Sequence, residues 1–133
     1  MKLLIAHGDA GTRFALRQVA VGLASIDLEP VESGEGRQTI ELLLADDAPD
    51  LAVVDWDLPG CDGPELCRQV RARRGSGSPY IILLTRGEHP LEDGFEAGAN
   101  DCVRVAAGAH ELQARISAGR RFLVPPSRER RAP

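Results

Sequence analysis

The sequence has few of the features that mark membrane, disulfide-linked or repetitive proteins. No apolar run approaches the roughly 18 residues that a membrane span needs, and the opening stretch Met1–Ile5 is too short for a signal peptide. The three cysteines are scattered and odd in number, which argues against a disulfide framework and a four-ligand zinc site. No segment recurs with the period of about 20–50 residues that marks a solenoid. We therefore expect a cytoplasmic protein with no contact to a membrane.

The chain also lacks the signatures of common enzyme sites. Its Gly34-Glu35-Gly36 sequence has neither the third glycine nor the following lysine of a phosphate-cradling loop. No Ser–His or Cys–His pairing is evident among the polar residues that follow the predicted strands. We therefore expect a protein that is not an enzyme.

Length and charge predict one domain followed by a tail. A chain of 133 residues, 43% of them hydrophobic, is typical of a single globular domain. The net charge of −4 is unevenly distributed, because residues 115–131 hold six arginines and one acid. Prolines interrupt this basic end and Phe122 is its single aromatic residue, so we expect no direct binding of nucleic acid. We interpret residues 1–124 as the domain and 125–133 as a disordered basic linker or tail.

The stretch from Pro49 to Pro64 is the most informative part of the chain. Leu51–Val54 is an unbroken apolar run, which is typical of a strand buried on both faces. Asp55 follows it directly, and ligands of open α/β sheets bind just beyond the carboxyl ends of strands. Turn-forming residues then lead to Pro64, which suits the first position of a helix.

Short apolar runs alternate with helix-like segments over the whole domain. The predicted strands cover residues 2–6, 28–31, 51–54, 80–84 and 102–105, and the predicted helices cover 12–23, 37–45, 64–74, 90–97 and 109–123. Such alternation requires parallel pairing through right-handed crossovers. The predicted fold is therefore α/β, a single doubly wound five-stranded parallel sheet with five helices. Pro30 cannot donate a ladder hydrogen bond, which places the second strand at an edge.

Candidate functional residues follow the predicted strands at the carboxyl end of the sheet. An aspartate there can accept a phosphoryl group if a hydroxyl binds a phosphate oxygen and positive charge offsets the anionic transition state. The candidates are His7, Gly8, Asp9, Asp55, Asp57, Thr85, Arg86 and Val105.

Four segments resemble the receiver domain of bacterial two-component response regulators, namely Pro49–Gly63, Tyr80–Thr85, Phe95–Asp101 and Glu111–Ile116. The similarity extends over about residues 2–123 and implies a flavodoxin-like, receiver-type fold. It also implies a sensor histidine kinase or another signalling protein as partner, and it suggests an output domain beyond the C-terminus. Leu91, Phe95 and the last helix could form a homodimer face.

The resemblance assigns a role to three residues of the candidate site. It implies Asp55 as the phospho-acceptor and Thr85 as the switch hydroxyl that binds the phosphoryl group. The backbone carbonyl of Asp57 would help to hold Mg²⁺, together with Asp55 and, in this chain, Asp9.

Several positions depart from the family pattern. His7 and Gly8 stand where the family has two metal-binding acids, and we expect this loss to weaken Mg²⁺ binding. Val105 replaces the family's lysine, and Cys102 replaces its aromatic switch residue. The only lysine, Lys2, begins the first strand at the opposite end of the sheet. His7 or Arg86 could instead face Asp55 as an internal counter-charge.

Three functions follow from these residues. The first is a pseudo-receiver, a regulatory interaction module tuned by partner binding, and the second is a conventional receiver phosphorylated on Asp55. We favour the first because loss of the acids and the lysine removes electrostatic stabilisation on which phosphoryl transfer depends. The third rests on a resemblance of Asp55, Asp57 and Thr85 to aspartate-nucleophile phosphatases of the haloacid dehalogenase type. Those enzymes need a catalytic lysine, which is missing here.

Overall fold

A computed structural model describes residues 1–22, 27–75 and 78–124 of the chain. Its strands are β1 (Lys2–Ala6), β2 (Glu29–Ser33), β3 (Leu51–Asp55), β4 (Tyr80–Thr85) and β5 (Asp101–Arg104). Its helices are α1 (Ala10–Val21), α2 (Gly36–Leu44), α3 (Gly63–Arg74), α4 (Leu91–Ala97) and α5 (Ala109–Leu123), with a 3₁₀ helix η1 (Val105–Ala107) before α5. The predicted elements are confirmed within two residues of their expected bounds, except that Val105 begins η1 instead of ending β5. The expected tail, 125–133, and the predicted end of the first helix at residue 23 lie outside the described residues.

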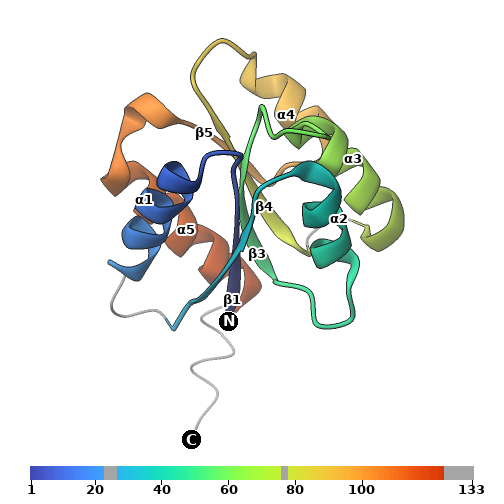
Figure 1. Cartoon of the computed structure of the whole chain (residues 1–133), viewed down its shortest axis with the longest axis horizontal. Coiled ribbons are helices and arrows are strands. Elements are labelled where there is room, and N and C mark those ends of the chain that lie inside the picture. Colours follow the sequence, from blue (N-terminus) through green and yellow to red (C-terminus); the bar gives the residue numbers. More distant parts are fainter. Residues whose placement is uncertain (23–26, 76–77, 125–133) are drawn as a thin grey trace, which may run out of the picture.

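The five strands form one parallel sheet in the order β2-β1-β3-β4-β5 (Figure 1). The strand β3 is central, and its residues Leu51–Val54 are all buried. The strand β2 lies at an edge, as Pro30 predicted. The doubly wound α/β fold is therefore confirmed, and Asp55 ends the middle strand of the sheet.

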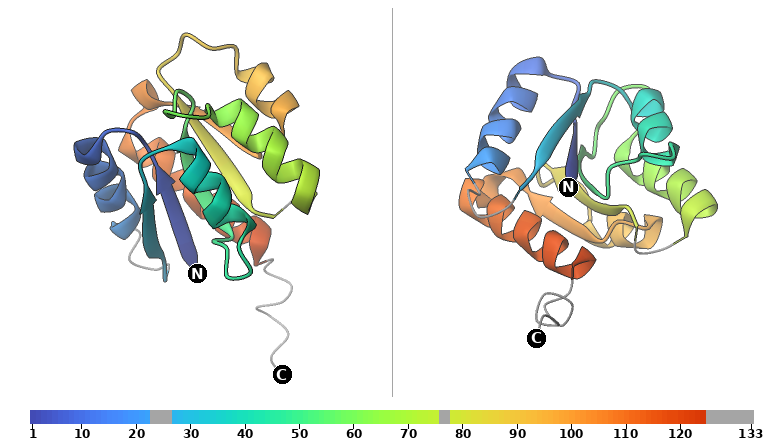
Figure 2. Two further views of the ribbon diagram at one scale, coloured as in Figure 1. Left: turned by 45° about the vertical axis from the view of Figure 1, so that its right-hand side comes forward. Right: turned by 90° about the horizontal axis from the view of Figure 1, so that it is seen from below.

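Helices cover both faces of the sheet and create two apolar cores (Figures 1 and 2). Successive side chains of a strand point to opposite faces, so Leu3 of β1 packs in the core beneath α1 and α5, whereas Leu4 packs beneath α2, α3 and α4. The helix α3 contributes Leu66 and Val70 to the second core. Of the described helices, none is long and apolar enough to cross a bilayer.

Side chains at the carboxyl edge of the sheet also begin several helices. Asp9 accepts a hydrogen bond from the Thr12 N–H and caps α1, and Asp62 accepts one from Glu65 and caps α3. Such caps satisfy backbone N–H groups that lack partners within the helix. At the C-terminal end of α4, Gly98 adopts a left-handed conformation with φ of 117°, which ends the helix as the sequence predicted.

Candidate functional site

The side chains of His7 and Asp55 lie close together at the carboxyl edge of the sheet. Ala6 of β1 pairs with Val54 of β3, so the residues that follow them emerge side by side at one edge of the sheet. The Nε2 atom of His7 lies 3.5 Å from Oδ2 of Asp55, and the two side chains are only 10% and 17% exposed. The Asp9 N–H donates to Nδ1 of His7 at 3.0 Å. Because Nδ1 is an acceptor, the ring proton is on Nε2 and faces the Asp55 carboxylate.

Two hollows open beside Asp55, and Arg86 lines both of them. The His7 hollow has a volume of about 440 Å³ and is lined by His7, Thr12, Leu16, Asp55, Leu84, Arg86, Val105 and Ala106. The His89 hollow has a volume of about 370 Å³ and is lined by Asp55, Asp57, Arg86, Glu88 and His89. Within the described residues, Arg86 makes no ion pair or side-chain hydrogen bond. Its guanidinium is therefore an unpaired positive charge at the edge of the Asp55 site.

The structure uses Asp9 to begin α1. Its Oδ2 atom accepts hydrogen bonds from the N–H and the hydroxyl of Thr12, at 2.8 and 2.7 Å. These bonds stabilise the carboxylate and lower the pKa of Asp9, with the hydroxyl bond as the larger cause. Asp9 lines neither hollow beside Asp55. Its expected role as a metal ligand stays a prediction.

The chain has little space for a second acid after β1. A Cβ atom built on Gly8 would lie 2.8 Å from Cγ of Pro59, so a side chain there would displace the loop after β3. Mg²⁺ prefers oxygen ligands in near-octahedral geometry, whereas the side chain beside Asp55 offers a nitrogen, Nε2 of His7, at 3.5 Å. Among the described residues, no three His, Cys, Asp or Glu side chains form a group that could hold a metal. These residues do not fit the expected Mg²⁺ site.

Thr85 ends β4 with its side chain buried. The residue is 1% exposed, and its Oγ1 atom accepts a hydrogen bond from the Gly87 N–H at 3.3 Å. The hydroxyl therefore lies at the carboxyl edge of the strand next to β3 but lines neither hollow.

Asp57 has a partner that the sequence did not suggest. Its N–H donates to Oδ1 of Asp55 at 3.3 Å, and its carboxylate lies 3.0 Å from Nε2 of His89. The His89 ring also stacks on Trp56, with centroids 4.7 Å apart. His89 belongs to the β4–α4 loop, so its side chain joins the two loops that flank Asp55. In the sequence, the only indication of this contact was the presence of a histidine three residues after Arg86.

The two substituted family positions lie on opposite sides of β5. Val105 is 53% exposed and lines the His7 hollow, so an apolar side chain borders Asp55 there. Cys102 is buried beneath α4, and burial raises the pKa of its thiol to about 11. A Cβ atom at Gly94 would lie 2.6 Å from the Cys102 sulfur and 2.9 Å from the Trp56 ring, which shows how closely α4 packs on both.

The sequence matches the response regulator receiver domain family over residues 4–117. The chain belongs to that family. This match decides between the two resemblances seen in the sequence and favours the receiver over the haloacid dehalogenase type.

Two curated response regulators show the extent of the similarity. The chain is 34% identical over 118 residues to the phosphate regulon transcriptional regulatory protein PhoB of Pseudomonas aeruginosa, which covers 87% of this chain and 50% of PhoB. It is 32% identical over 127 residues to the response regulator MprA of Mycolicibacterium vanbaalenii, which covers 94% of this chain and 52% of MprA. The receiver chain thus spans about half the length of these relatives.

Solved receiver structures share the fold. The receiver domain of the sensor histidine kinase PA1611 of Pseudomonas aeruginosa superimposes with a TM-score of 0.74 at 21% identity, covering 88% of this chain and 94% of that one. Its crystal structure has a magnesium ion coordinated in the active site cleft. At this identity the likeness shows the fold alone, which agrees with the strand order described above.

Proposed function

We propose that this receiver domain is a pseudo-receiver, a regulatory interaction module whose state is set by partner binding and not by phosphorylation of Asp55. One observation carries the proposal: the Nε2 atom of His7 lies 3.5 Å from Oδ2 of Asp55, and both side chains are largely buried. The imidazole belongs to one of the two positions at which the family has the acids that would hold a metal ion. The site then needs no Mg²⁺ to hold its carboxylate.

The loss of the lysine supports the same proposal. A phosphoryl group on Asp55 would need positive charge around its oxygens, and Val105 offers none. In PA1611 a magnesium ion lies in the cleft. In this chain the acids that would hold such an ion are replaced by His7 and Gly8, and Asp9 caps α1.

A second candidate function is a conventional receiver phosphorylated on Asp55 by a histidine kinase. The observation in its favour is Arg86, whose guanidinium lines both hollows beside Asp55 without a partner among the described residues. Arginine binds phosphate oxygens in a bidentate manner and could take the place of the missing lysine.

In either case we propose a role in a two-component system in the cytoplasm. A sensor histidine kinase or another signalling protein would bind the domain, and a homodimer could form through Leu91, Phe95 and α5. The domain itself would not act as an enzyme. Because PhoB is named a transcriptional regulatory protein, our expectation of no nucleic-acid binding has no support, and an output domain could supply such binding in a longer chain.

Trp56 provides a test, because it adjoins Asp55 and stacks on His89. Its fluorescence would be followed during titration with Mg²⁺ and then with beryllofluoride, a phosphoryl mimic. We expect no saturable change at millimolar Mg²⁺. A saturable change that disappears in Asp55→Asn would contradict the pseudo-receiver and favour phosphorylation.

A gain-of-function variant provides the matched positive control. The double substitution His7→Asp and Val105→Lys restores one acid and the lysine. We expect it to acquire an Mg²⁺-dependent beryllofluoride response that the unmodified chain lacks. Either single substitution should give a smaller response, since metal and ammonium act on the same phosphoryl oxygens.

A further inference from the structure

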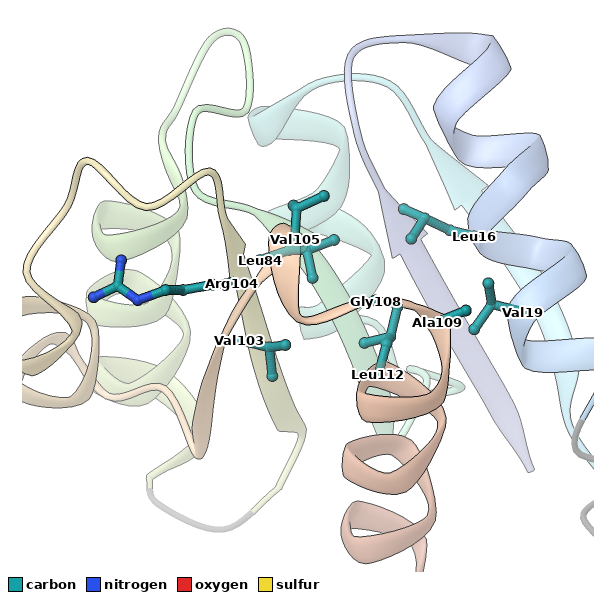
Figure 3. Close-up of a pocket in the computed structure, with 9 residues that line it drawn as sticks. All are labelled: Leu16, Val19, Leu84, Val103, Arg104, Val105, Gly108, Ala109 and Leu112. Atoms are coloured by element: carbon teal, nitrogen blue, oxygen red, sulfur yellow. The ribbon is translucent and has the colours of Figure 1, made fainter.

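An apolar cavity lies between α1, α5 and the carboxyl ends of β4 and β5, on the side of the sheet opposite α3 (Figure 3). Its volume is about 140 Å³. The residues that line it are Leu16, Val19, Leu84, Val103, Arg104, Val105, Gly108, Ala109 and Leu112. The only charged member is Arg104, and its side chain points away from the others and donates to the Gly87 carbonyl at 3.0 Å.

The size and lining of this cavity suit a small apolar group. The cavity is partly open to solvent, and its lining offers few of the two to four polar partners that hold a water molecule in place. An enclosed apolar cavity of about 150 Å³ in another protein binds benzene. Here the inward-facing side chains are aliphatic, and Figure 3 shows Leu16, Val105 and Leu112 converging on the same space from three elements. A phenyl ring or a short branched chain would bury apolar surface there without displacing a bound polar network.

Val105 connects the apolar cavity with the phospho-acceptor site. The cavity and the His7 hollow share Leu16, Leu84 and Val105 in their lining. A lysine at position 105 would bring an ammonium group to this junction. The valine instead extends the apolar surface toward Asp55, so the apolar cavity and the more polar His7 hollow adjoin each other at these shared residues.

The His7 hollow has one charge without a partner. The Asp55 carboxylate is faced by the Nε2 proton of His7 and accepts the Asp57 N–H. Arg86 lines the same hollow and has no ion pair within the described residues. A guanidinium pairs best with a planar, bidentate anion such as a carboxylate.

We propose that this combined site binds a small carboxylic acid with an aromatic or branched apolar group, the apolar group in the cavity and the carboxylate on Arg86. The regulatory meaning of this binding rests on the proposed pseudo-receiver function, since a ligand beside Asp55 would take the place of phosphorylation as the signal. Binding itself can be measured whether or not Asp55 accepts a phosphoryl group.

The test is a titration of the full chain with benzoate, phenylacetate, 3-phenylpropionate and 4-phenylbutyrate, followed by methyl NMR. The methyl groups of Leu16, Val19, Leu84, Val103, Val105 and Leu112 report on the cavity directly. The four acids differ in the number of carbons between the ring and the carboxylate. For the acid whose spacing fits best we expect saturable shifts with a dissociation constant of about 0.1–1 mM, as for a ligand of about eleven heavy atoms. 2-Phenylethylamine, which carries the opposite charge on a similar frame, should bind more weakly.

Variants separate the two ends of the site. Arg86→Gln should weaken binding of the acid by roughly tenfold, the size of one charge-assisted hydrogen bond, whereas Arg73→Gln, on the exposed surface of α3, should leave it unchanged. Val19→Phe and Ala109→Leu each fill the cavity and should abolish the methyl shifts. Asp55→Asn should strengthen binding of the acids by removing a like charge.

Three results would overturn the proposal. These are the absence of methyl shifts with every acid, tighter binding of the amine than of the acids, and equal binding by Arg86→Gln and Arg73→Gln. Beryllofluoride titration of the same samples distinguishes failure of the pseudo-receiver proposal from failure of the ligand-site proposal. A response to beryllofluoride would refute the pseudo-receiver, whereas the methyl titration alone decides whether the acid binds.

Discussion

The imidazole of His89 lies flat on the indole of Trp56, with an interplanar angle of 5° and ring centroids 4.7 Å apart. The same imidazole reaches the Asp57 carboxylate at 3.0 Å. One side chain of the β4–α4 loop is thus fixed by two consecutive residues of the loop after β3. This contact therefore ties the β4–α4 loop to the loop after β3.

Replacing His89 with alanine should release the β4–α4 loop. The loss of an aromatic stack should lower the free energy of unfolding by about 0.5–1.5 kcal/mol, and Trp56 emission should shift to longer wavelength as water reaches the ring. Urea titration and fluorescence would measure both effects. His110→Ala, at an exposed position of α5, is the control and should change neither.

Asp9 should behave as a helix cap with a clear pH dependence. Its pKa lies below the ordinary carboxyl value of 3.8 because the bonds from Thr12 favour the charged form. The stabilisation is therefore present above that value and is lost as the pH falls through the lowered pKa. Asp9→Ala should be less stable than the original chain at pH 7, and the difference should shrink on acidification. Asp9→Asn, which keeps a capping oxygen, should lose less stability at pH 7.

Gly94 should not tolerate a side chain. An alanine Cβ there would lie 2.6 Å from the sulfur of Cys102 and 2.9 Å from the ring of Trp56, so α4 would have to move away from the sheet. We expect Gly94→Ala to lower the free energy of unfolding by about 1–3 kcal/mol, measured by urea denaturation. Glu96→Ala, on the exposed side of α4, should change the free energy of unfolding by no more than about 0.5 kcal/mol. A stable Gly94→Ala with unchanged Trp56 emission would contradict this packing.

The three thiols should differ in reactivity. Burial raises the pKa of Cys67 to about 12 and that of Cys102 to about 11, whereas Cys61 is only partly buried. Ellman's reagent at pH 8 should therefore modify Cys61 in the native protein, and all three thiols in denaturant. The raised pKa means that Cys67 loses its proton more readily in the unfolded chain than in the folded one. The free energy of unfolding is therefore unaffected by this thiol below about pH 9 and decreases as the pH rises toward 12. Rapid labelling of three thiols in the native state would refute the burial of Cys67 and Cys102.

Local patterns predicted the fold because each element carries its own signal. The apolar run Leu51–Val54 identified the central strand, and Pro30 placed the second strand at an edge. The position of Asp55 at the carboxyl edge followed from strand direction alone. The boundaries moved by a residue or two where capping side chains, such as Asp9, started a helix earlier than the apolar pattern did.

The contacts within the site could not be predicted in the same way. His89 lies 32 residues from Asp57 in the chain, and nothing in the local pattern of either loop requires the other. The resemblance made Asp9 a candidate metal ligand, and that role stays a prediction. Its hydrogen bonds with Thr12, which begin α1, became visible only in the structure.

The sequence by itself determined the doubly wound α/β fold, the edge position of the second strand and the place of Asp55, because apolar periodicity and strand direction are encoded within single elements. Only the tertiary structure decided what surrounds Asp55: the Nε2 proton of His7, the unpaired Arg86 and the apolar cavity that meets the site at Val105. These depend on side chains from loops distant in sequence, whose positions are fixed by packing across the sheet and not by any local pattern.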